Sequence, residues 1–232
     1  MYVKFWKRFF DLTLSLLALI VLFPILVILT IIGAIAMRGN PFFMQARPGK
    51  IDPKTGKEKI FKLIKFRTMS NKKDENGDLL PDEVRLNKYG KFLRSTSLDE
   101  LPELVNIILG SSGLVGPRPF LVRDCVFLTD EQRRRHTVRP GLTGLAQVNG
   151  RNNITWEQKF EYDLQYIDQG ITFMGDLKIL LQTVSKVLKR SDTVREGTVS
   201  DMDYGDWLMM EGKVDQATYD EKQKEARELL NV

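Results

Sequence analysis

The sequence has very few of the side chains that form disulfides or zinc sites. Among its 232 residues there is one cysteine, Cys125, and one histidine, His136. A single cysteine excludes a disulfide within the chain and suits a reducing compartment. One cysteine and one histidine cannot build a His/Cys zinc site. Any metal would therefore need oxygen ligands, which favour magnesium or manganese.

Charged side chains are absent from one long stretch, residues 12–37. A straight helix over this stretch would be about 39 Å long, whereas the hydrocarbon core of a bilayer is about 30 Å thick. Pro24 falls near its centre. Proline predicts a kink, because it has no N–H to donate and its ring clashes with the preceding turn. Each half would be about 18 Å long, too short to cross the bilayer alone.

Basic residues flank this stretch at both ends, and the positive-inside rule places both ends in the cytoplasm. We therefore predict that residues 1–38 form a re-entrant membrane helix, kinked at Pro24, which enters one leaflet and returns. A tilted membrane span with a proline kink is the alternative. The flanking basic residues are Lys4, Lys7, Arg8, Arg38, Arg47 and Lys50.

The rest of the chain is predicted to be a compact cytoplasmic domain, so that the fold class is α+β and mostly α-helical. Composition predicts a loop at residues 39–59 and a strand at residues 60–69. The apolar face of residues 175–190 fits either an interfacial amphipathic helix or ordinary core packing. The basic run at residues 133–136 predicts a solvated helix face, or a contact with lipid phosphates. Further helices are predicted at residues 101–109, 156–169 and 215–230.

The chain is basic, with a formal net charge of +5 and an isoelectric point of about 9.2. A basic protein favours anionic partners. There is no Lys-rich or Arg-rich arm and no recognised nucleic-acid-binding module, so no nucleic-acid partner is predicted.

Two adjacent carboxylates, Asp99 and Glu100, stand in the segment RSTSLDELPELVNIILGSSGLVGPRP, residues 94–119. In one interpretation Ser97 caps a helix and Glu100 completes a capping box; in the other, Pro102 is the first helical residue and the acids lie just before it. Either arrangement favours ionised carboxylates and anionic ligands near the positive end of the helix. An ionised aspartate beside phosphate-binding groups is what covalent phosphoryl transfer requires.

Four segments follow one another along the chain: KLIKFRTM at residues 62–69, RSTSLDELPEL at 94–104, LVGPRP at 114–119 and RPGLTGLAQVNGR at 139–151. As a set, in this order and spacing, they resemble the bacterial sugar transferase family, the monotopic polyprenyl-phosphate phosphoglycosyltransferases of the small single-domain type. The resemblance covers roughly residues 4–189. The family pattern has Gly-Asp-Met-Ser before LVGPRP, whereas this chain has GSSG at residues 110–113.

The resemblance implies an enzyme that transfers a phosphosugar from a UDP-sugar to undecaprenyl phosphate, releasing UMP, as the first membrane step of surface glycan or glycoconjugate synthesis. It implies Asp99 as the nucleophile that forms an aspartyl-phosphosugar intermediate, Glu100 as its catalytic partner, and Mg²⁺ bound near Asp99. Guanidinium forks and a lysine suit phosphate oxygens. The expected substrate-binding and phosphate-binding residues are Lys65, Arg67, Arg94, Arg118, Arg139 and Arg151.

The predicted domains are the membrane helix at residues 1–38, the catalytic domain at residues 39–190 and a C-terminal extension at residues 191–232. We expect the protein in the bacterial inner membrane, with the catalytic domain facing the cytoplasm, where UDP-sugar, lipid phosphate and membrane lipid meet. A non-catalytic monotopic module that binds anionic lipid or a glycan-assembly complex is the alternative. The sequence leaves open which sugar is transferred, the role of the extension, and the oligomeric state, a homo-oligomer included.

Overall fold

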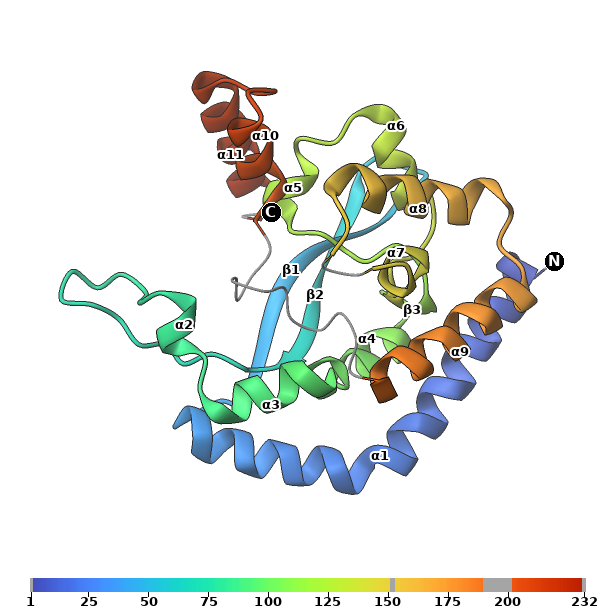
Figure 1. The fold of residues 1–232 in the computed structure, drawn as a ribbon. Coiled ribbons are helices and arrows are strands. Elements are labelled where there is room, and N and C mark those ends of the chain that lie inside the picture. Colours follow the sequence, from blue (N-terminus) through green and yellow to red (C-terminus); the bar gives the residue numbers. More distant parts are fainter. Residues whose placement is uncertain (1, 151–152, 190–201, 231–232) are drawn as a thin grey trace.

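A computed structural model describes residues 2–150, 153–189 and 202–230. The protein is α+β and mostly helical, as predicted, with two small two-stranded sheets. One long helix runs along the edge of a body that is built from the sheets and many short helices (Figure 1).

The long helix is α1 (Lys7–Met37), which follows a π-helical turn, η1 (Tyr2–Trp6). Pro24 lies inside α1, and Figure 1 shows the helix changing direction part-way along its length. Arg38 ends it in the left-handed conformation, with its N–H pointing back to the last turn. α1 is the one helix in the described part of the chain that is long and apolar enough to cross a membrane, and 11% of its most apolar window is buried within the protein. The re-entrant path stays a prediction.

Polar side chains attach the start of α1 to the body. Arg8 donates from Nη1 to the carbonyl of Ile107 at 2.5 Å and from Nη2 to the carbonyl of Ile108 at 2.7 Å. These carbonyls lie in the last turn of α4 (Glu103–Leu109), where a cation also complements the helix dipole. Asp11, which is 5% exposed, accepts the N–H of Leu114 at 3.0 Å. The apolar helix therefore supplies both a cation and an anion to the domain.

The larger sheet is an antiparallel hairpin of β1 (Phe42–Ile51) and β2 (Glu58–Phe66). The strand predicted at residues 60–69 is confirmed as β2, although it begins and ends earlier. The loop predicted at residues 39–59 is wrong over β1. Gly, Pro and Lys in that segment indicated a turn, but pairing with the apolar strand β2 extends the backbone, and the turn itself is confined to residues 52–57.

Between the hairpin and the acids lie α2 (Asp82–Arg85) and α3 (Lys88–Thr96), and the acids themselves occupy a short 3₁₀ helix, η2 (Leu98–Glu100). Ser97 ends α3 at φ 56° and its side chain forms no cap, so the capping-box interpretation is wrong. The acids precede Pro102 and α4, as in the second interpretation, but in a turn of their own. The left-handed Ser97 reverses the chain and separates the acids from α3.

The second half of the chain is helical around a short parallel pair, β3 (Gly113–Val115) and β4 (Gly141–Thr143). The helices predicted at residues 101–109, 156–169, 175–190 and 215–230 are confirmed by α4, α8, α9 and α11. The helices of this half are α5 (Val122–Cys125), α6 (Asp130–Arg133), η3 (Arg134–Thr137), α7 (Leu145–Val148), α8 (Trp156–Asp168), α9 (Phe173–Lys189), α10 (Tyr204–Met210) and α11 (Gln216–Leu230).

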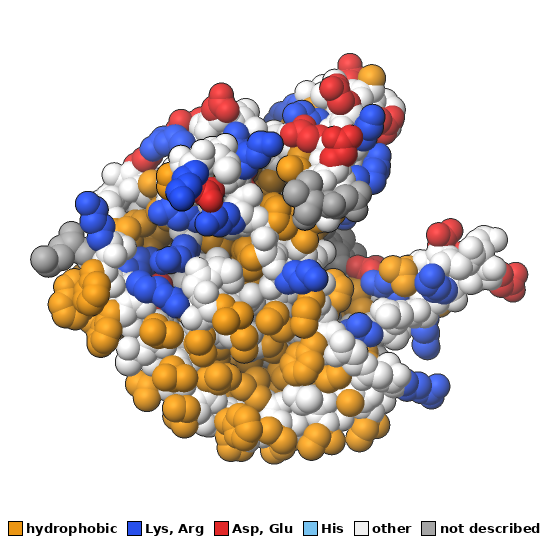
Figure 2. All heavy atoms as spheres, turned by 180° about the vertical axis from the view of Figure 1, so that it is seen from behind, with side chains coloured by type: hydrophobic (Ala, Val, Ile, Leu, Met, Phe, Trp, Pro, Cys, Tyr) orange, Lys and Arg blue, Asp and Glu red, His pale blue; other side chains and the backbone are white. Residues whose placement is uncertain are grey.

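Large apolar side chains remain exposed on α1 and on one side of α9. Val21 in α1 is 74% exposed and Leu188 in α9 is 79% exposed. Figure 2 shows an apolar lower surface, on the side where Figure 1 places α1, with Lys and Arg side chains gathered above it. An apolar face bordered by basic residues matches the two solvents of a membrane surface, hydrocarbon and anionic headgroups.

We predict that Arg8→Ala destabilises the whole protein. The substitution removes two charge-assisted hydrogen bonds, each of which contributes about 1.5–3 kcal/mol, and leaves carbonyls of α4 without these partners. We expect a loss of about 2 kcal/mol or more in the free energy of unfolding, measured by denaturant unfolding in detergent micelles. Lys4→Ala, an exposed basic residue one turn earlier, is the matched control and should change little. Equal stability of the two variants would contradict the prediction.

Candidate active site

A cavity of about 580 Å³ lies between the end of β2, the η2 turn, the turn at residues 117–121, α7 and α8. Six of the eight predicted site residues line it. Arg139 does not line it and is exposed just before β4, and Arg151 lies outside the described residues. The six that the structure brings together are Lys65, Arg67, Arg94, Asp99, Glu100 and Arg118.

Glu100 holds two cations at the wall of this cavity. It is 9% exposed, and its Oε1 lies 3.1 Å from Nζ of Lys65 and also pairs with the guanidinium of Arg118. Glu103, at 1% exposure, lies 3.1 Å from the same Lys65 ammonium. Burial works against the charge of Arg118, but Glu100 and Glu103 outweigh it and raise its pKa. Two acids therefore hold Lys65 and Arg118 at the wall that Asp99 also lines.

Arg94 reaches the cavity from α3. Its Nε donates to Oγ1 of Thr68 at 3.1 Å. Burial lowers its pKa, while the negative charge of Asp99 acts in the opposite direction, which places the two groups within electrostatic reach of each other. Asp99 thus lies within electrostatic reach of both Arg94 and Arg118.

Several cavity residues carry buried polar atoms that have no hydrogen-bond partner within the described ranges. Buried polar groups in proteins are nearly always paired, so a set of unpaired polar atoms around one cavity indicates a ligand. Burial also lowers the pKa of Arg47 to about 10, with the charge of Arg118 as the next cause. The unpaired atoms are Nε of Arg47, Nε of Arg67, Oγ of Ser70, Nε of Arg85, and both amide atoms of Gln147.

Sequence reasoning missed Arg47, Ser70, Arg85 and Gln147. Arg47 was placed among the basic flanks of the membrane helix, and the β1 strand that carries it into the cavity was predicted as loop. Gln147 stands in the segment RPGLTGLAQVNGR, so its place in a recognised motif was the signal that could have identified it.

The glycines of that segment serve close backbone packing. A Cβ on Gly141 would lie 2.1 Å from the nitrogen of Gly116, and a Cβ on Gly144 would lie 2.2 Å from the carbonyl oxygen of Gly116. β3 and β4 therefore approach closely only because these positions lack side chains. The turn that bears Arg118 starts from this contact, and Nη2 of Arg135 donates to the carbonyl of Arg118 at 2.6 Å.

The loop that departs from the family pattern is packed against α1. Oγ of Ser112, a residue 1% exposed, donates to the carbonyl of Pro140 at 3.0 Å. A Cβ on Gly113 would lie 2.9 Å from Oδ2 of Asp11. The loop at residues 110–113 has no acid of its own, and a carboxylate from α1 occupies the space beside it.

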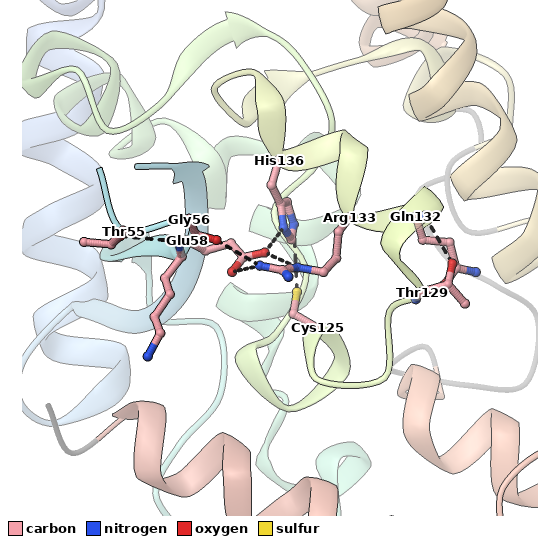
Figure 3. A network of polar contacts seen from close by, with 9 residues as sticks. Thr55, Gly56, Glu58, Cys125, Thr129, Gln132, Arg133 and His136 are labelled. Carbon is pink, nitrogen blue, oxygen red and sulfur yellow. Dashed lines mark hydrogen bonds and ion pairs between the residues drawn. The ribbon is translucent and has the colours of Figure 1, made fainter. Parts of the chain in front are cut away.

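Arg133, His136 and Glu58 form a network outside the cavity (Figure 3). The prediction of a solvated basic run at residues 133–136 is wrong for Arg135 and His136, which are buried, whereas Arg133 and Arg134 are partly exposed. Glu58 accepts from Nε of Arg133 at 2.9 Å and contacts Nδ1 of His136 at 3.0 Å. Burial alone would raise the pKa of Glu58, but these hydrogen bonds outweigh it and lower the pKa to about 2.

Cys125 completes this network, with Sγ 4.0 Å from Nε2 of His136 (Figure 3). The order cysteine, histidine, glutamate is that of a nucleophilic triad. Burial, however, raises the pKa of the Cys125 thiol to about 12 and lowers the pKa of His136, and Cys125 does not line the cavity. A protonated, enclosed thiol is a poor nucleophile. The network therefore connects the β1–β2 hairpin to η3 and α5, and no reaction is assigned to it.

No group of three or more His, Cys, Asp or Glu side chains in the described part of the chain could hold a metal ion. The acids that line the cavity nearest the cations are Asp99 and Glu100, and Glu100 is already paired. Mg²⁺ commonly binds through one or two carboxylates together with substrate phosphates and water. Asp99 with a bound phosphate fits that pattern, whereas a metal cage made of protein alone does not.

Comparison with known proteins identifies the family. The model of the bacterial sugar transferases matches residues 2–190. The chain belongs to the bacterial sugar transferase family. This confirms the family prediction and, with it, the prediction that the chain is a sugar-transferring enzyme.

Individual relatives also have names of sugar or sugar-phosphate transferases. The chain is 49% identical over 187 residues to the uncharacterized sugar transferase EpsL of Bacillus subtilis. This alignment covers 78% of this chain and 87% of that protein. It is 40% identical over 198 residues to a UDP-glucose:undecaprenyl-phosphate glucose-1-phosphate transferase of Klebsiella pneumoniae, and 32% identical over 199 residues to an undecaprenyl-phosphate galactose phosphotransferase of Salmonella typhimurium. These two alignments cover 78% and 81% of this chain but 40% and 41% of the relatives' own length.

We predict that Glu58→Gln weakens the acid sensitivity of the fold. In the folded protein the pKa of the Glu58 carboxyl is about 2, below the value of 4.5 for an ordinary glutamate. Its contribution to stability is therefore complete above pH 4.5 and is lost as the pH falls toward about 2. The Tm from thermal unfolding should therefore fall less steeply between pH 6 and pH 2 in the variant than in the wild type, and the variant should start from a lower Tm at pH 6. Glu161→Gln, an exposed acid, is the control; a slope in Glu58→Gln equal to that of the wild type would refute the assignment.

Proposed function

We propose that this protein transfers a phosphosugar from a UDP-sugar to undecaprenyl phosphate, giving undecaprenyl-diphosphate-sugar and UMP. Within a family of sugar transferases, the observation that carries this proposal is the cavity itself, which Asp99 lines together with lysine and arginine side chains. A sugar nucleotide and a lipid phosphate are both anionic, and a cavity of this charge attracts and holds phosphate.

The proposed course has two displacements with Asp99 as the nucleophile. Its carboxylate oxygen attacks the β-phosphorus of the UDP-sugar, the bond from that phosphorus to the bridging oxygen breaks, and UMP leaves with the electron pair. An oxygen of undecaprenyl phosphate then attacks the aspartyl phosphosugar and releases the carboxylate. Phosphoryl transfer depends mainly on positioning and charge neutralisation, which Lys65, Arg67 and Arg118 would supply.

Glu100 is proposed to act through its neighbours. Its carboxylate pairs with Lys65 and Arg118, so its first effect is to fix those cations at the wall that Asp99 shares. We therefore place Glu100 as a positioning residue rather than as the base that deprotonates the lipid phosphate.

The exposed apolar faces of α1 and α9 support a site at the membrane surface, where the two substrates would meet. α1 exposes apolar residues along most of its length, and α9 adds Met174, Leu181 and Leu188. We propose that α1 enters one leaflet and returns, that α9 lies at the interface, and that the cavity faces the cytoplasm from the bacterial inner membrane. A lipid phosphate held at the headgroup plane would then meet a water-soluble nucleotide sugar without leaving the bilayer.

We predict that Asp99→Asn abolishes UMP release from UDP-sugars in the presence of undecaprenyl phosphate. The amide is neutral and a poor nucleophile toward phosphorus, so we expect a loss of at least a thousandfold. The measurement is UMP formation by protein in nanodiscs with a panel of UDP-sugars. Asp220→Asn, an exposed aspartate of α11, is the matched control. Retention of a tenth of the activity in Asp99→Asn would rule out the nucleophile assignment.

We propose Mg²⁺ as the cofactor, held by Asp99 and by the substrate's phosphate oxygens, where it would offset phosphate charge. Removal of divalent cations with EDTA should lower UMP release by at least tenfold, because the cavity's own acids and phosphates would then face each other with less compensation. Activity should return on addition of Mg²⁺ in excess of the chelator. Undiminished activity in EDTA would show that the cations of the protein suffice.

A further inference from the structure

The described part of the C-terminal extension, residues 202–230, lies outside the stretch that the family model matches, which ends at residue 190. It nevertheless reaches the active-site cavity. Met202 and Asp203 line the same cavity as Asp99, beside Asp124 and Trp156. A segment beyond the shared family region therefore forms part of the wall around the proposed reaction.

This segment is firmly attached to the domain. The N–H of Tyr204 donates to Oδ1 of Asp124 at 2.8 Å in a buried contact. The Tyr204 ring lies 5.1 Å from the rings of both Trp156 and Phe160, measured between centroids. At the other end, Ala226 of α11 is 2% exposed and packs in a buried cluster with α5. Figure 1 shows α10 and α11 together beside α5.

The attachment fixes the carboxylate of Asp203 at the cavity wall. Asp203 pairs with Arg123, and the side chain of Asp203 is 18% exposed whereas that of Arg123 is 52% exposed. Asp124, the next residue after Arg123, also lines the cavity. The oxygens of these two carboxylates, one of them paired with Arg123, are hydrogen-bond acceptors that suit neutral donors such as the hydroxyls of a sugar.

Gln147 adds complementary chemistry to the same cavity. Both atoms of its amide are buried, and neither has a protein partner within the described residues. An amide offers a donor and an acceptor, which is what a ring with several hydroxyl groups requires. Trp156 contributes an aromatic ring to the lining. Carboxylate, amide and aromatic ring together offer acceptors, a donor and a flat face, which suit an uncharged, hydroxyl-bearing ring.

We propose that Asp203, assisted by Gln147, is a specificity-determining residue that accepts hydrogen bonds from the hexose of the UDP-sugar, so that the C-terminal extension selects which sugar is transferred. The inference rests on the proposed function. The relatives named above differ in the sugar, glucose in one and galactose in the other, while both names contain undecaprenyl phosphate. A wall contributed from outside the shared region is suited to the part of the substrate that differs.

The test compares sugar selectivity in wild type and Asp203→Asn. The kcat/KM for UMP release is measured with UDP-glucose, UDP-galactose, UDP-N-acetylglucosamine and UDP-N-acetylgalactosamine in nanodiscs, and the Kd of UMP is measured by calorimetry. Loss of a hydrogen bond to a charged acceptor should reduce the ratio between the best and the other sugars by about tenfold or more, with the Kd of UMP unchanged. Asp220→Asn, on the exposed face of the same extension, should keep both values.

Two results would overturn the inference while leaving the proposed function in place. One is an unchanged ratio between sugars in an active Asp203→Asn protein; the other is a weaker Kd for UMP with the ratio preserved, which would assign this wall to the nucleoside. Thermal unfolding of each variant checks that α10 and α11 remain attached, and Gln147→Ala repeats the comparison without touching the extension. Failure of the wild type to release UMP from any UDP-sugar would instead refute the proposed function.

Discussion

The active site depends on one buried arrangement of charge, the carboxylate of Glu100 between Lys65 and Arg118. Removing such groups from water costs several kcal/mol for each ion, and only their mutual contact offsets that cost. Glu103 adds a second, almost fully buried acid to the same Lys65. The strand β2, the turn η2 and the turn after β3 are therefore held in one relative position, because each of them contributes a charge that the others neutralise.

One helix, α1, has two kinds of surface, an exposed apolar surface along most of its length and a polar contact with the domain at its start. Along most of α1 the side chains are apolar and exposed, as they are in a helix that contacts hydrocarbon. At its start the same helix carries Arg8 and Asp11, and both bond to backbone groups of the domain. The apolar helix and the rest of the described chain are consequently parts of one structure. The loop that lacks the acid of the family pattern lies at this junction, beside the carboxylate of Asp11.

The sequence predicted the elements whose signal is local or carried by a motif. The long apolar helix, the strand β2, the helices α4, α8, α9 and α11, and six residues around the cavity were all identified. β1 was missed because its Gly, Pro and Lys residues indicate a turn, and only its pairing with β2 makes it a strand. The burial of Arg135 and His136 was missed for a similar reason. Their partners, Asp163 and Glu58, are distant in sequence, and a run of basic residues carries no sign of where its counter-charges lie.

The contact of Arg8 with the end of α4 has a consequence for how the enzyme can be handled. A shortened protein that begins after Met37 would lose the apolar helix, but it would also lose the cation that binds the carbonyls of Ile107 and Ile108 and the anion that binds the N–H of Leu114. The interior surface uncovered around Phe66 and Leu93 would be apolar as well. The rest of the chain is thus not a unit from which α1 can simply be removed, and purification of the enzyme must keep α1 in place.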